Sequence, residues 1–365
     1  MATKFTGLRP SYFVGPAIAL LLLAISWGQS LATPVLFILG LVLIATVFSA
    51  VHHAEVVALR VGEPYGSLIL AVAVTIIEVG MILVLMIDSP ETTKNLARDT
   101  VFTAVMITTG GMIGAALLIK SLRRKVATFN PEGVVGALAA LASLSILSLV
   151  LPSFTTSTSG PTFNGTQLVF AAVTSLVLYL TFVAMQTVRH RDYFLPPARL
   201  NSTQSISVHV KPPTSRQAGL SLVGLLASLV AVVGLAKVTS PLIQGVVTSL
   251  GFPQTVVALS IAALVLLPEF ISAVKASLYG RTQTSLNLAL GSALASIGLT
   301  IPAIAVISLV FGFQVNLGLG PTDIILLLLA LVVSALTLIP GKATVLQGAV
   351  HLSIFGAFIL LVFTP

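Results

Sequence analysis

Long apolar segments alternate with short polar connections along almost the whole chain. Eleven segments approach or exceed the roughly 20 residues that a helix needs to cross a bilayer. They lie at residues 11–29, 34–57, 66–88, 100–120, 133–151, 165–187, 217–237, 255–277, 284–311, 321–339 and 344–364. The pattern predicts an all-α, polytopic membrane protein with about 11 transmembrane helices.

The first apolar segment has the features of two different elements. Lys4 and Arg9 precede it and the small residues of "SLATP" follow it, as in a cleavable signal peptide. Residues 11–28 are nevertheless long enough to span by themselves. We therefore expect an uncleaved first transmembrane helix within residues 1–29.

Composition supports a membrane protein and narrows its chemistry. Of the 365 residues, 56% are hydrophobic and 8% are charged, and no cysteine is present. The absence of cysteine excludes disulfides, thiolate metal sites and cysteine nucleophiles. The "HHAE" stretch is too short to bind zinc by itself and no H-E-x-x-H motif occurs, so we expect a protein that is not an enzyme and needs no cofactor.

Charge is distributed asymmetrically about the predicted spans. The formal net charge is +8, which is also typical of nucleic-acid binders. With a cytoplasmic N-terminus, fifteen of the eighteen Lys and Arg residues face the cytoplasm, and only Lys94, Arg98 and Lys237 lie outside. This bias predicts a multi-pass protein of the cell inner (cytoplasmic) membrane with its C-terminus outside, whose partner is the lipid bilayer and not nucleic acid.

The two halves of the chain share a pattern. The charged, proline-containing stretch 188–216 is the only long polar connection and reads as a cytoplasmic linker. On either side of it, "VGEPYGSLILAVAVTIIEVG" (61–80) and "LGFPQTVVALSIAALVLLPEF" (250–270) both place a lone Glu after Gly-x-Pro and an apolar stretch. The Gly-to-Glu distance is 16 residues in the first copy and 18 in the second. A span rich in small residues then follows in each half, "ITTGGMIGAALL" and "LNLALGSALASIGL".

This order predicts a five-helix repeat at 30–187 and a second at 217–365. An odd number of spans per repeat places the copies in opposite orientations. Inverted repeats of this kind are typical of secondary transporters, which bind their substrate near the midplane.

Two carboxylates lie deep in the predicted spans. Glu78 and Glu269 occupy equivalent positions in the repeats, and no Lys or Arg lies at a comparable depth. A charged side chain at a helix centre costs about 2.5–3.5 kcal/mol on insertion scales. The structural alternative is a protonated glutamate hydrogen-bonded to a neighbouring helix. The functional interpretation is a site in which two carboxylates bind either a metal cation or protons.

Other oxygen groups and helix-disrupting residues lie near these carboxylates in the sequence. Hard cations such as Ca²⁺ take six to eight oxygen ligands. The candidate ligands are Thr75, Thr109, Asn287, Ser292 and Ser296, although a hydroxyl can instead bond within its own helix. The candidate helix breaks are Pro268, Gly110, Gly111 and Gly291, with close packing of glycines such as Gly110 and Gly114 as the alternative. The candidate proton relay or gate residues are His52, His53, Glu55 and His351, for which an interfacial role is the alternative in the first three.

Four segments carry a resemblance to a known family. They are "HHAEVVALRVGEPYGSLILAVAVTIIEV", "MITTGGMIGAALL", "LLPEFISAVKASLYGRTQTSLNLALGSALASIGLTIP" and "LQGAVHLSIF". In these segments the chain resembles the cation/Ca²⁺ exchanger superfamily, and within it the ChaA-type calcium/sodium(potassium)-proton antiporters. The resemblance implies a five-plus-five inverted arrangement after a first helix, with Glu78 and Glu269 alternating between cation and proton.

The sequence leaves the transported cation open. The superfamily often has a Gly-Ser-x-x-Ser-Asn pattern in its first small-residue motif, whereas "TTGGMIG" offers only Thr108, Thr109 and backbone oxygens. We expect a cation/proton antiporter that exports Ca²⁺, with Na⁺ and K⁺ as further candidate substrates. The alternatives are a Na⁺(K⁺)/H⁺ antiporter with little Ca²⁺ transport, a passive cation channel and a polytopic membrane enzyme.

Overall fold

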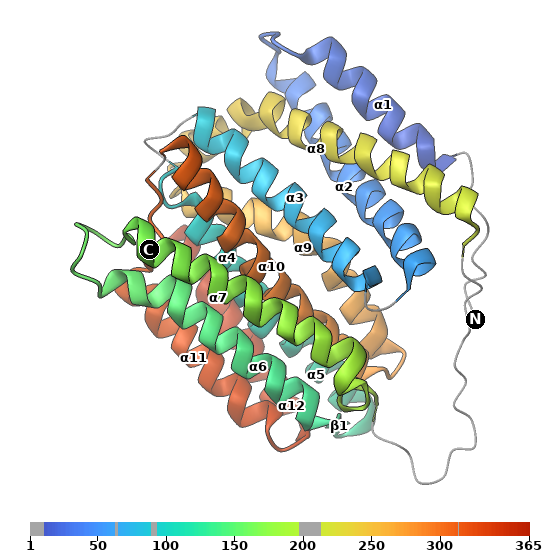
Figure 1. Ribbon diagram of the computed structural model, residues 1–365, viewed down its shortest axis with the longest axis vertical. Helices are drawn as coiled ribbons and strands as arrows, with labels where there is room; N and C mark the ends of the chain where they lie inside the picture. Colours follow the sequence, from blue (N-terminus) through green and yellow to red (C-terminus); the bar gives the residue numbers. More distant parts are fainter. Residues whose placement is uncertain (1–10, 63–64, 89–92, 197–212, 313) are drawn as a thin grey trace. The chain divides into compact units, whose positions relative to one another are not determined.

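The computed structural model describes residues 11–62, 65–88, 93–196, 213–312 and 314–365 (Figure 1). Some features of the sequence analysis lie outside the described residues. They are Lys4, Arg9, the Glu63–Pro64 pair of the first Gly-x-Pro motif, and residues 197–212 of the predicted linker.

The described chain is almost entirely helical. Its α-helices are α1 (Ser11–Ser26), α2 (Thr33–Val61), α3 (Tyr65–Asp88), α4 (Leu96–Met106), α5 (Ile113–Arg124), α6 (Pro131–Ser145), α7 (Gly165–Ala184), α8 (Ser215–Ser249), α9 (Thr255–Leu278), α10 (Thr282–Phe311), α11 (Pro321–Leu338) and α12 (Val345–Phe363). Three π-helical segments, η1 (Ile107–Met112), η2 (Ile146–Val150) and η4 (Met185–Arg189), and two short 3₁₀ segments, η3 (Leu151–Ser153) and η5 (Arg191–Phe194), extend or join them. The two strands are β1 (Ala127–Thr128) and β2 (Lys342–Ala343).

The helices follow the apolar segments of the sequence. Among the described residues, ten helical stretches are long and apolar enough to cross a membrane. The first predicted span is the exception, because α1 has 16 residues, fewer than the roughly 20 that a full crossing needs.

One helix is much longer than its apolar pattern indicates. Helix α8 has 35 residues and contains Pro241, whereas the sequence placed its end near residue 237. Lys237, which the sequence analysis placed on the outer side, is therefore not at the end of its helix. It lies within α8, and its Nζ is 5.3 Å from the centre of the Trp27 ring, where the aromatic face stabilises the charge.

The described chain forms two compact units. The first contains residues up to Ile77 and Pro197–Leu242, and the second contains Glu78–Pro196 and Ile243–Pro365. The chain passes from one unit to the other inside α3 and inside α8. Each unit thus takes segments from both predicted repeats, and the repeat boundaries themselves remain a prediction.

In the first unit, α1 packs along α2. Two glycines of α8 allow this helix to come close to α2 and α1. A Cβ at Gly224 of α8 would lie 2.6 Å from His53 Nε2, and a Cβ at Gly234 would lie 2.4 Å from a Leu23 methyl group. His53 is fully buried, and its ring centre is 5.1 Å from that of Phe13. This imidazole is therefore part of the packing within the first unit, and its interfacial or relay role stays a prediction.

In the second unit, α10 packs against α6, α7 and α9, while α4 lies along α9 and α12 along α5. Two glycines bring helices especially close. A Cβ at Gly298 would lie 2.6 Å from Tyr179 Cβ on α7, and one at Gly348 would lie 2.6 Å from the Leu118 nitrogen on α5. Leu, Ile, Val and Ala residues fill the remaining space between these helices.

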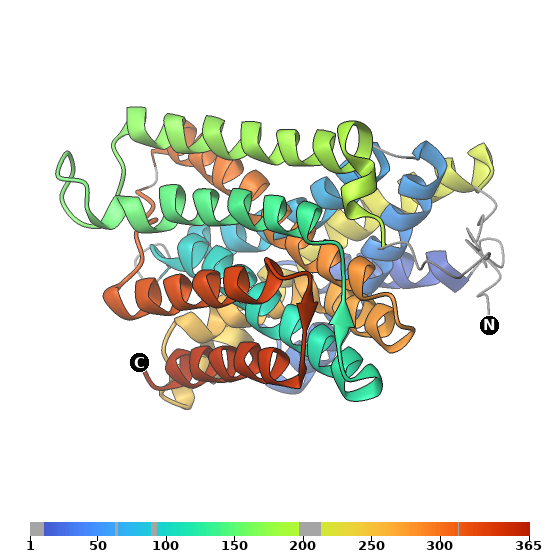
Figure 2. The ribbon, with the colours of Figure 1, turned by 90° about the horizontal axis from the view of Figure 1, so that it is seen from below.

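A short β-ladder joins the ends of four helices of this unit. Strand β1, which lies between α5 and α6, pairs antiparallel with β2, which lies between α11 and α12 (Figure 2). The Phe129 N–H extends the ladder by bonding the Gly341 carbonyl at 3.0 Å. At the adjoining end of α5, Arg123 donates to the Leu278 carbonyl of α9 at 2.9 Å.

We predict that Gly298→Ala destabilises the protein and Gly291→Ala does not. Both changes improve helix propensity by about 1 kcal/mol. A new Cβ at position 291 meets nothing within 4 Å, whereas at position 298 it meets the Tyr179 Cβ at 2.6 Å. Overpacking of this kind costs about 1–3 kcal/mol. Thermal unfolding in detergent measures the difference, and equal unfolding midpoints for the two variants would contradict the close packing of α7 on α10.

Candidate functional site

The Glu78 side chain of α3 accepts a hydrogen bond from a serine of α10. Glu78 is 3% exposed. Ser296 Oγ lies 3.0 Å from Oε1 and 3.0 Å from Oε2 of Glu78, so a single hydroxyl donor is shared between both carboxylate oxygens. Both residues belong to the second unit. The structure therefore brings together two of the residues that the sequence selected from different halves of the chain.

A threonine that the sequence analysis missed lies on the next turn. Thr300 is fully buried and follows Ser296 by four residues on α10, so both lie on the same helix face. Its hydroxyl lies within reach of the Glu78 carboxylate, although Oγ1 makes no hydrogen bond of ideal geometry within the described chain. The spacing Ser292, Ser296, Thr300 was the available signal, because these residues recur at four-residue intervals.

Glu269 is buried in α9, at 8% exposure. The helix runs unbroken from Thr255 to Leu278 with Pro268 inside it, so the expected helix break at Pro268 is wrong. Proline lacks an N–H, so the Leu264 carbonyl still loses its usual helical donor. The next residue, Phe270, packs on η1, where its Cε2 lies 3.3 Å from the position of a Cβ at Gly111.

The helix irregularity occurs at Gly110 and Gly111 instead, in the π-helical segment η1. π-Helical turns are rare and frequently lie at functional sites. The hydroxyls of Thr108 and Thr109 bond back to carbonyls of their own helix, the latter to Val105 at 2.6 Å. The Thr109 hydroxyl proton is therefore engaged within its own helix, which is the alternative that the sequence left open.

The glycines of this segment serve helix packing. A Cβ at Gly110 would lie 2.9 Å from Phe355 Cβ, and a Cβ at Gly114 would lie 2.9 Å from His351 Cβ. The close-packing alternative therefore describes Gly110 and Gly114 here, with α12 as the neighbouring helix. Gly291, by contrast, has open space where its Cβ would be.

Asn287 belongs to a chain of hydrogen bonds away from the carboxylates. Its Nδ2 donates to the Phe194 carbonyl at 2.7 Å, and its Oδ1 accepts from Gln283 Nε2 at 3.0 Å. Gln283 Oε1 in turn accepts from the Asn130 N–H at 2.7 Å. The amide thus joins α10 to η5 and to the start of α6. Ser292 is half-buried on the same helix.

The histidine candidates lie in different units. His351 is 1% exposed in α12, with Nδ1 2.8 Å from the Thr109 carbonyl oxygen and Nε2 3.2 Å from Thr337 Oγ1. His52 and Glu55 lie in α2 of the first unit, half-buried and exposed respectively, as does the buried His53. Thr75 is buried in α3, one turn before Glu78.

No preformed metal centre accompanies these residues. Within the described ranges, no group of three or more His, Asp and Glu side chains could hold a metal ion. The carboxylate, hydroxyl and carbonyl oxygens around Glu78 and Glu269 are the type of donor that hard cations prefer. A cation at this site would be transported substrate.

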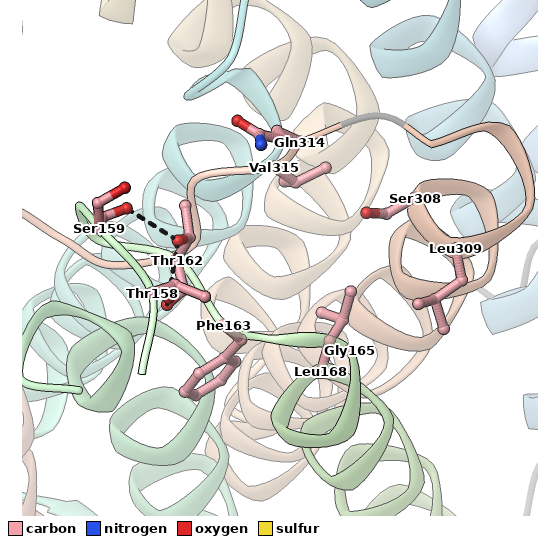
Figure 3. A pocket seen from close by; sticks show the side chains of 10 residues that line it. All are labelled: Thr158, Ser159, Thr162, Phe163, Gly165, Leu168, Ser308, Leu309, Gln314 and Val315. Atoms are coloured by element: carbon pink, nitrogen blue, oxygen red, sulfur yellow. Dashed lines mark hydrogen bonds between the residues drawn. The ribbon is translucent and has the colours of Figure 1, made fainter. Parts of the chain in front are cut away.

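A separate cavity of about 270 Å³ lies between the loop before α7 and the end of α10 (Figure 3). Its lining is rich in hydroxyl groups and carries no charged side chain. Thr162 Oγ1 donates to Thr158 Oγ1 at 3.0 Å and to the Ser159 carbonyl at 3.3 Å. Ser308 lies twelve residues beyond Ser296 on α10, about 18 Å along the helix. The cavity is therefore distinct from the Glu78 site.

Known proteins similar to this chain are membrane transporters. A protein of Sinorhizobium fredii, y4hA, which is named as a candidate ionic transporter, is 47% identical over 88% of this chain and 87% of its own length. The sodium-potassium/proton antiporter ChaA of Escherichia coli is 32% identical over 97% of this chain and 96% of its own length.

Solved structures agree on the fold. Native YfkE superposes with a TM-score of 0.72 at 16% identity, covering 97% of this chain and all of YfkE. The H⁺/Ca²⁺ exchanger CAX gives 0.69 at 13% identity, covering 96% of this chain and 87% of CAX. These likenesses confirm the predicted fold class, an all-α multi-pass membrane protein with the repeat architecture of exchangers.

The family model described as sodium/calcium exchanger protein matches residues 30–188 and 220–364. Together these two ranges include the segment of each carboxylate. The chain therefore belongs to the sodium/calcium exchanger protein family.

Proposed function

We propose that this protein is a cation/proton antiporter of the cytoplasmic membrane that exports Ca²⁺ and also accepts Na⁺ or K⁺. The observation that carries the proposal is Glu78, which is buried and accepts a hydrogen bond from the Ser296 hydroxyl. Family membership and the names of its relatives support antiport. A monovalent Na⁺(K⁺)/H⁺ antiporter is the second candidate, because the ChaA relative is named for sodium and potassium.

The proposed exchange mechanism follows from the charge of the two carboxylates. Two ionised carboxylates carry a charge of −2, which one Ca²⁺ or two protons neutralise. Moving the site with its charge balanced avoids most of the cost of exposing a carboxylate to the membrane interior. In the proposed cycle, Glu78 and Glu269 release the cation and take protons on the outer side, then lose the protons on the inner side and bind the next cation.

The neighbouring oxygens complete the proposed site. The Ser296 hydroxyl donates to Glu78 when no cation is present and, after rotating, turns its lone pairs to a bound ion. Thr300 and the Leu264 carbonyl are further candidate ligands, the first without a hydrogen bond and the second opposite the missing N–H of Pro268. In this proposal the N-terminus is cytoplasmic and the C-terminus is outside, as the positive charges favour.

We predict that Glu78→Gln and Glu269→Gln each abolish exchange. Glutamine keeps the size of the side chain but neither balances a cation nor releases a proton. Dissipation of a pH gradient in everted vesicles on addition of Ca²⁺, Na⁺, K⁺ or Mg²⁺ measures the activity and names the transported ions.

Glu132→Gln is the matched control, because Glu132 lies in the first turn of α6. Transport by either site variant at the wild-type rate would refute the two-carboxylate site. A wild-type protein that responds to none of the four cations would refute the proposed function.

We predict that Ser296→Ala raises the apparent KM for the cation by about ten-fold, since a hydrogen bond to a charged group contributes roughly 1.5–3 kcal/mol. Thr300→Val should have a smaller effect in the same direction. Ser143→Ala is the control, because that hydroxyl bonds only to the Ala139 carbonyl of its own helix. An unchanged KM in Ser296→Ala would remove the serine from the site.

We also predict that the cation affinity of the wild type increases with pH. Protons and cations compete for the same carboxylates in the proposed cycle, so fewer protons leave more sites open. The apparent KM measured between pH 6 and pH 9 should fall steadily, by up to about ten-fold per pH unit for each competing proton. A KM independent of pH would contradict direct competition.

A further inference from the structure

His351 is a buried imidazole that the exchange mechanism above does not use. It lies in α12 at 1% exposure and contacts two other elements. Its Nδ1 is 2.8 Å from the Thr109 carbonyl oxygen in η1, and its Nε2 is 3.2 Å from Thr337 Oγ1 in α11. Three membrane-spanning elements therefore meet at one side chain.

The chemistry of these partners fixes the tautomer. A carbonyl oxygen only accepts, so Nδ1 must carry the proton and donate to Thr109. In the neutral ring, Nε2 is then the acceptor and the Thr337 hydroxyl donates to it. Both ring nitrogens are thus occupied by protein partners in an uncharged histidine.

The Thr109 carbonyl needs such a partner because of the π-helical turn. In a regular α-helix it would accept from the Ile113 N–H, four residues later. Here the Ile113 N–H bonds the carbonyls of Thr108 and Gly110 instead. The π turn therefore releases the Thr109 carbonyl, and a buried carbonyl without a donor is costly. The Nδ1–H of His351 replaces the lost bond.

Packing places this turn next to the helix that carries Glu269. Gly114 lacks a Cβ that would lie 2.9 Å from His351 Cβ, which lets α12 approach η1 closely. From α9, the Phe270 ring packs against Gly111 of the same turn. The geometry of η1 therefore sets the wall against which the Glu269 segment packs.

The surroundings of His351 do not supply a charged partner at either nitrogen. Helix α12 contains no Asp, Glu, Lys or Arg. Among the described residues, the ionisable side chains on the elements packed against α12 are Lys120, Arg123 and Arg124 on α5, Glu269 and Lys275 on α9, Asp323 on α11 and Lys342 on β2. The two contacts of the ring are a carbonyl and a hydroxyl.

We propose that His351 is a positioning residue that holds the π-helical turn of η1, and through it the wall on which Phe270, the next residue after Glu269, packs, without carrying a proton in the transport cycle. This inference rests on the proposed antiport at Glu78 and Glu269. It assigns a role to the histidine that differs from the relay or gate considered from the sequence.

Three substitutions at one position test it. His351→Asn keeps an N–H donor where Nδ1 lies but cannot titrate, His351→Gln places its amide where Nε2 lies, and His351→Leu removes both bonds. We expect His351→Asn to stay within about two-fold of wild type in cation KM, with the same dependence of rate on pH. We expect His351→Leu and His351→Gln to raise the KM by about ten-fold, the effect of losing one buried hydrogen bond.

A second measurement does not depend on transport. Hydrogen exchange followed by mass spectrometry should show about ten-fold faster exchange of the backbone amides in residues 107–117 for His351→Leu, and wild-type exchange for His351→Asn. Thr337→Val should leave this segment protected, because the Nδ1 bond remains.

The outcomes separate the two proposals. If His351→Asn is as inactive as Glu78→Gln, or shifts the pH profile, the histidine carries a proton and the positioning role is refuted. If His351→Leu exchanges hydrogen like wild type in residues 107–117, the imidazole does not hold the turn and the inference also fails. A wild type without cation-driven proton flux would refute antiport itself, while the exchange experiment would still decide whether His351 holds η1.

Discussion

A carboxylate inside a membrane-spanning helix needs something to balance its charge, and the described residues in contact with Glu78 provide hydroxyl dipoles. The Ser296 hydroxyl faces both carboxylate oxygens at 3.0 Å, which stabilises the charge but leaves the sum at −1. The remaining balance has to come from what the site binds. Because a proton and a metal cation both meet this need, a site of this kind is suited to exchanging one for the other. The close helix packing in the second unit keeps the donor in place.

The polar groups near these residues divide into those committed to the structure and those left for a ligand. The Thr108 and Thr109 hydroxyls bond within their own helix, and the Asn287 amide bonds to Gln283 and Phe194. The buried Thr300 hydroxyl has no such commitment within the described chain. Several polar groups that look available in the sequence therefore have partners within the helices. Ser296 and Thr300 lie along a single face of α10.

Apolar length and the rarity of charge were enough to predict the class of fold, the positions of ten helices, and the burial of Glu78 and Glu269. The sequence also selected Ser296, although not its pairing with Glu78, because two spans from different halves meet only in three dimensions. Local rules failed where tertiary packing decides. Pro268 does not interrupt α9, and the end of α8 lies beyond a proline.

The π-helical turn could not be predicted either, because its stability depends on a histidine more than 200 residues away in the chain. The burial of His53 was unpredictable for a similar reason: nothing in "VHHAEV" reveals that Phe13 and Gly224 pack against the ring. Thr300 was missed because a hydroxyl in an apolar helix is normally satisfied by its own backbone. The lack of a hydrogen-bond partner for its hydroxyl within the described chain can be recognised only in the three-dimensional structure.

The β-ladder restricts which parts of the chain can act as moving bodies. Strand β1 belongs to the first half of the sequence and β2 to the second, yet they are hydrogen-bonded to each other within one compact unit. A transport motion that separated the two sequence halves as rigid blocks would have to tear this ladder apart at every turnover. The predicted sequence repeats and the compact units are consequently different divisions of the same chain. The polypeptide crosses from one compact unit to the other inside α3 and α8, not at the predicted repeat boundary.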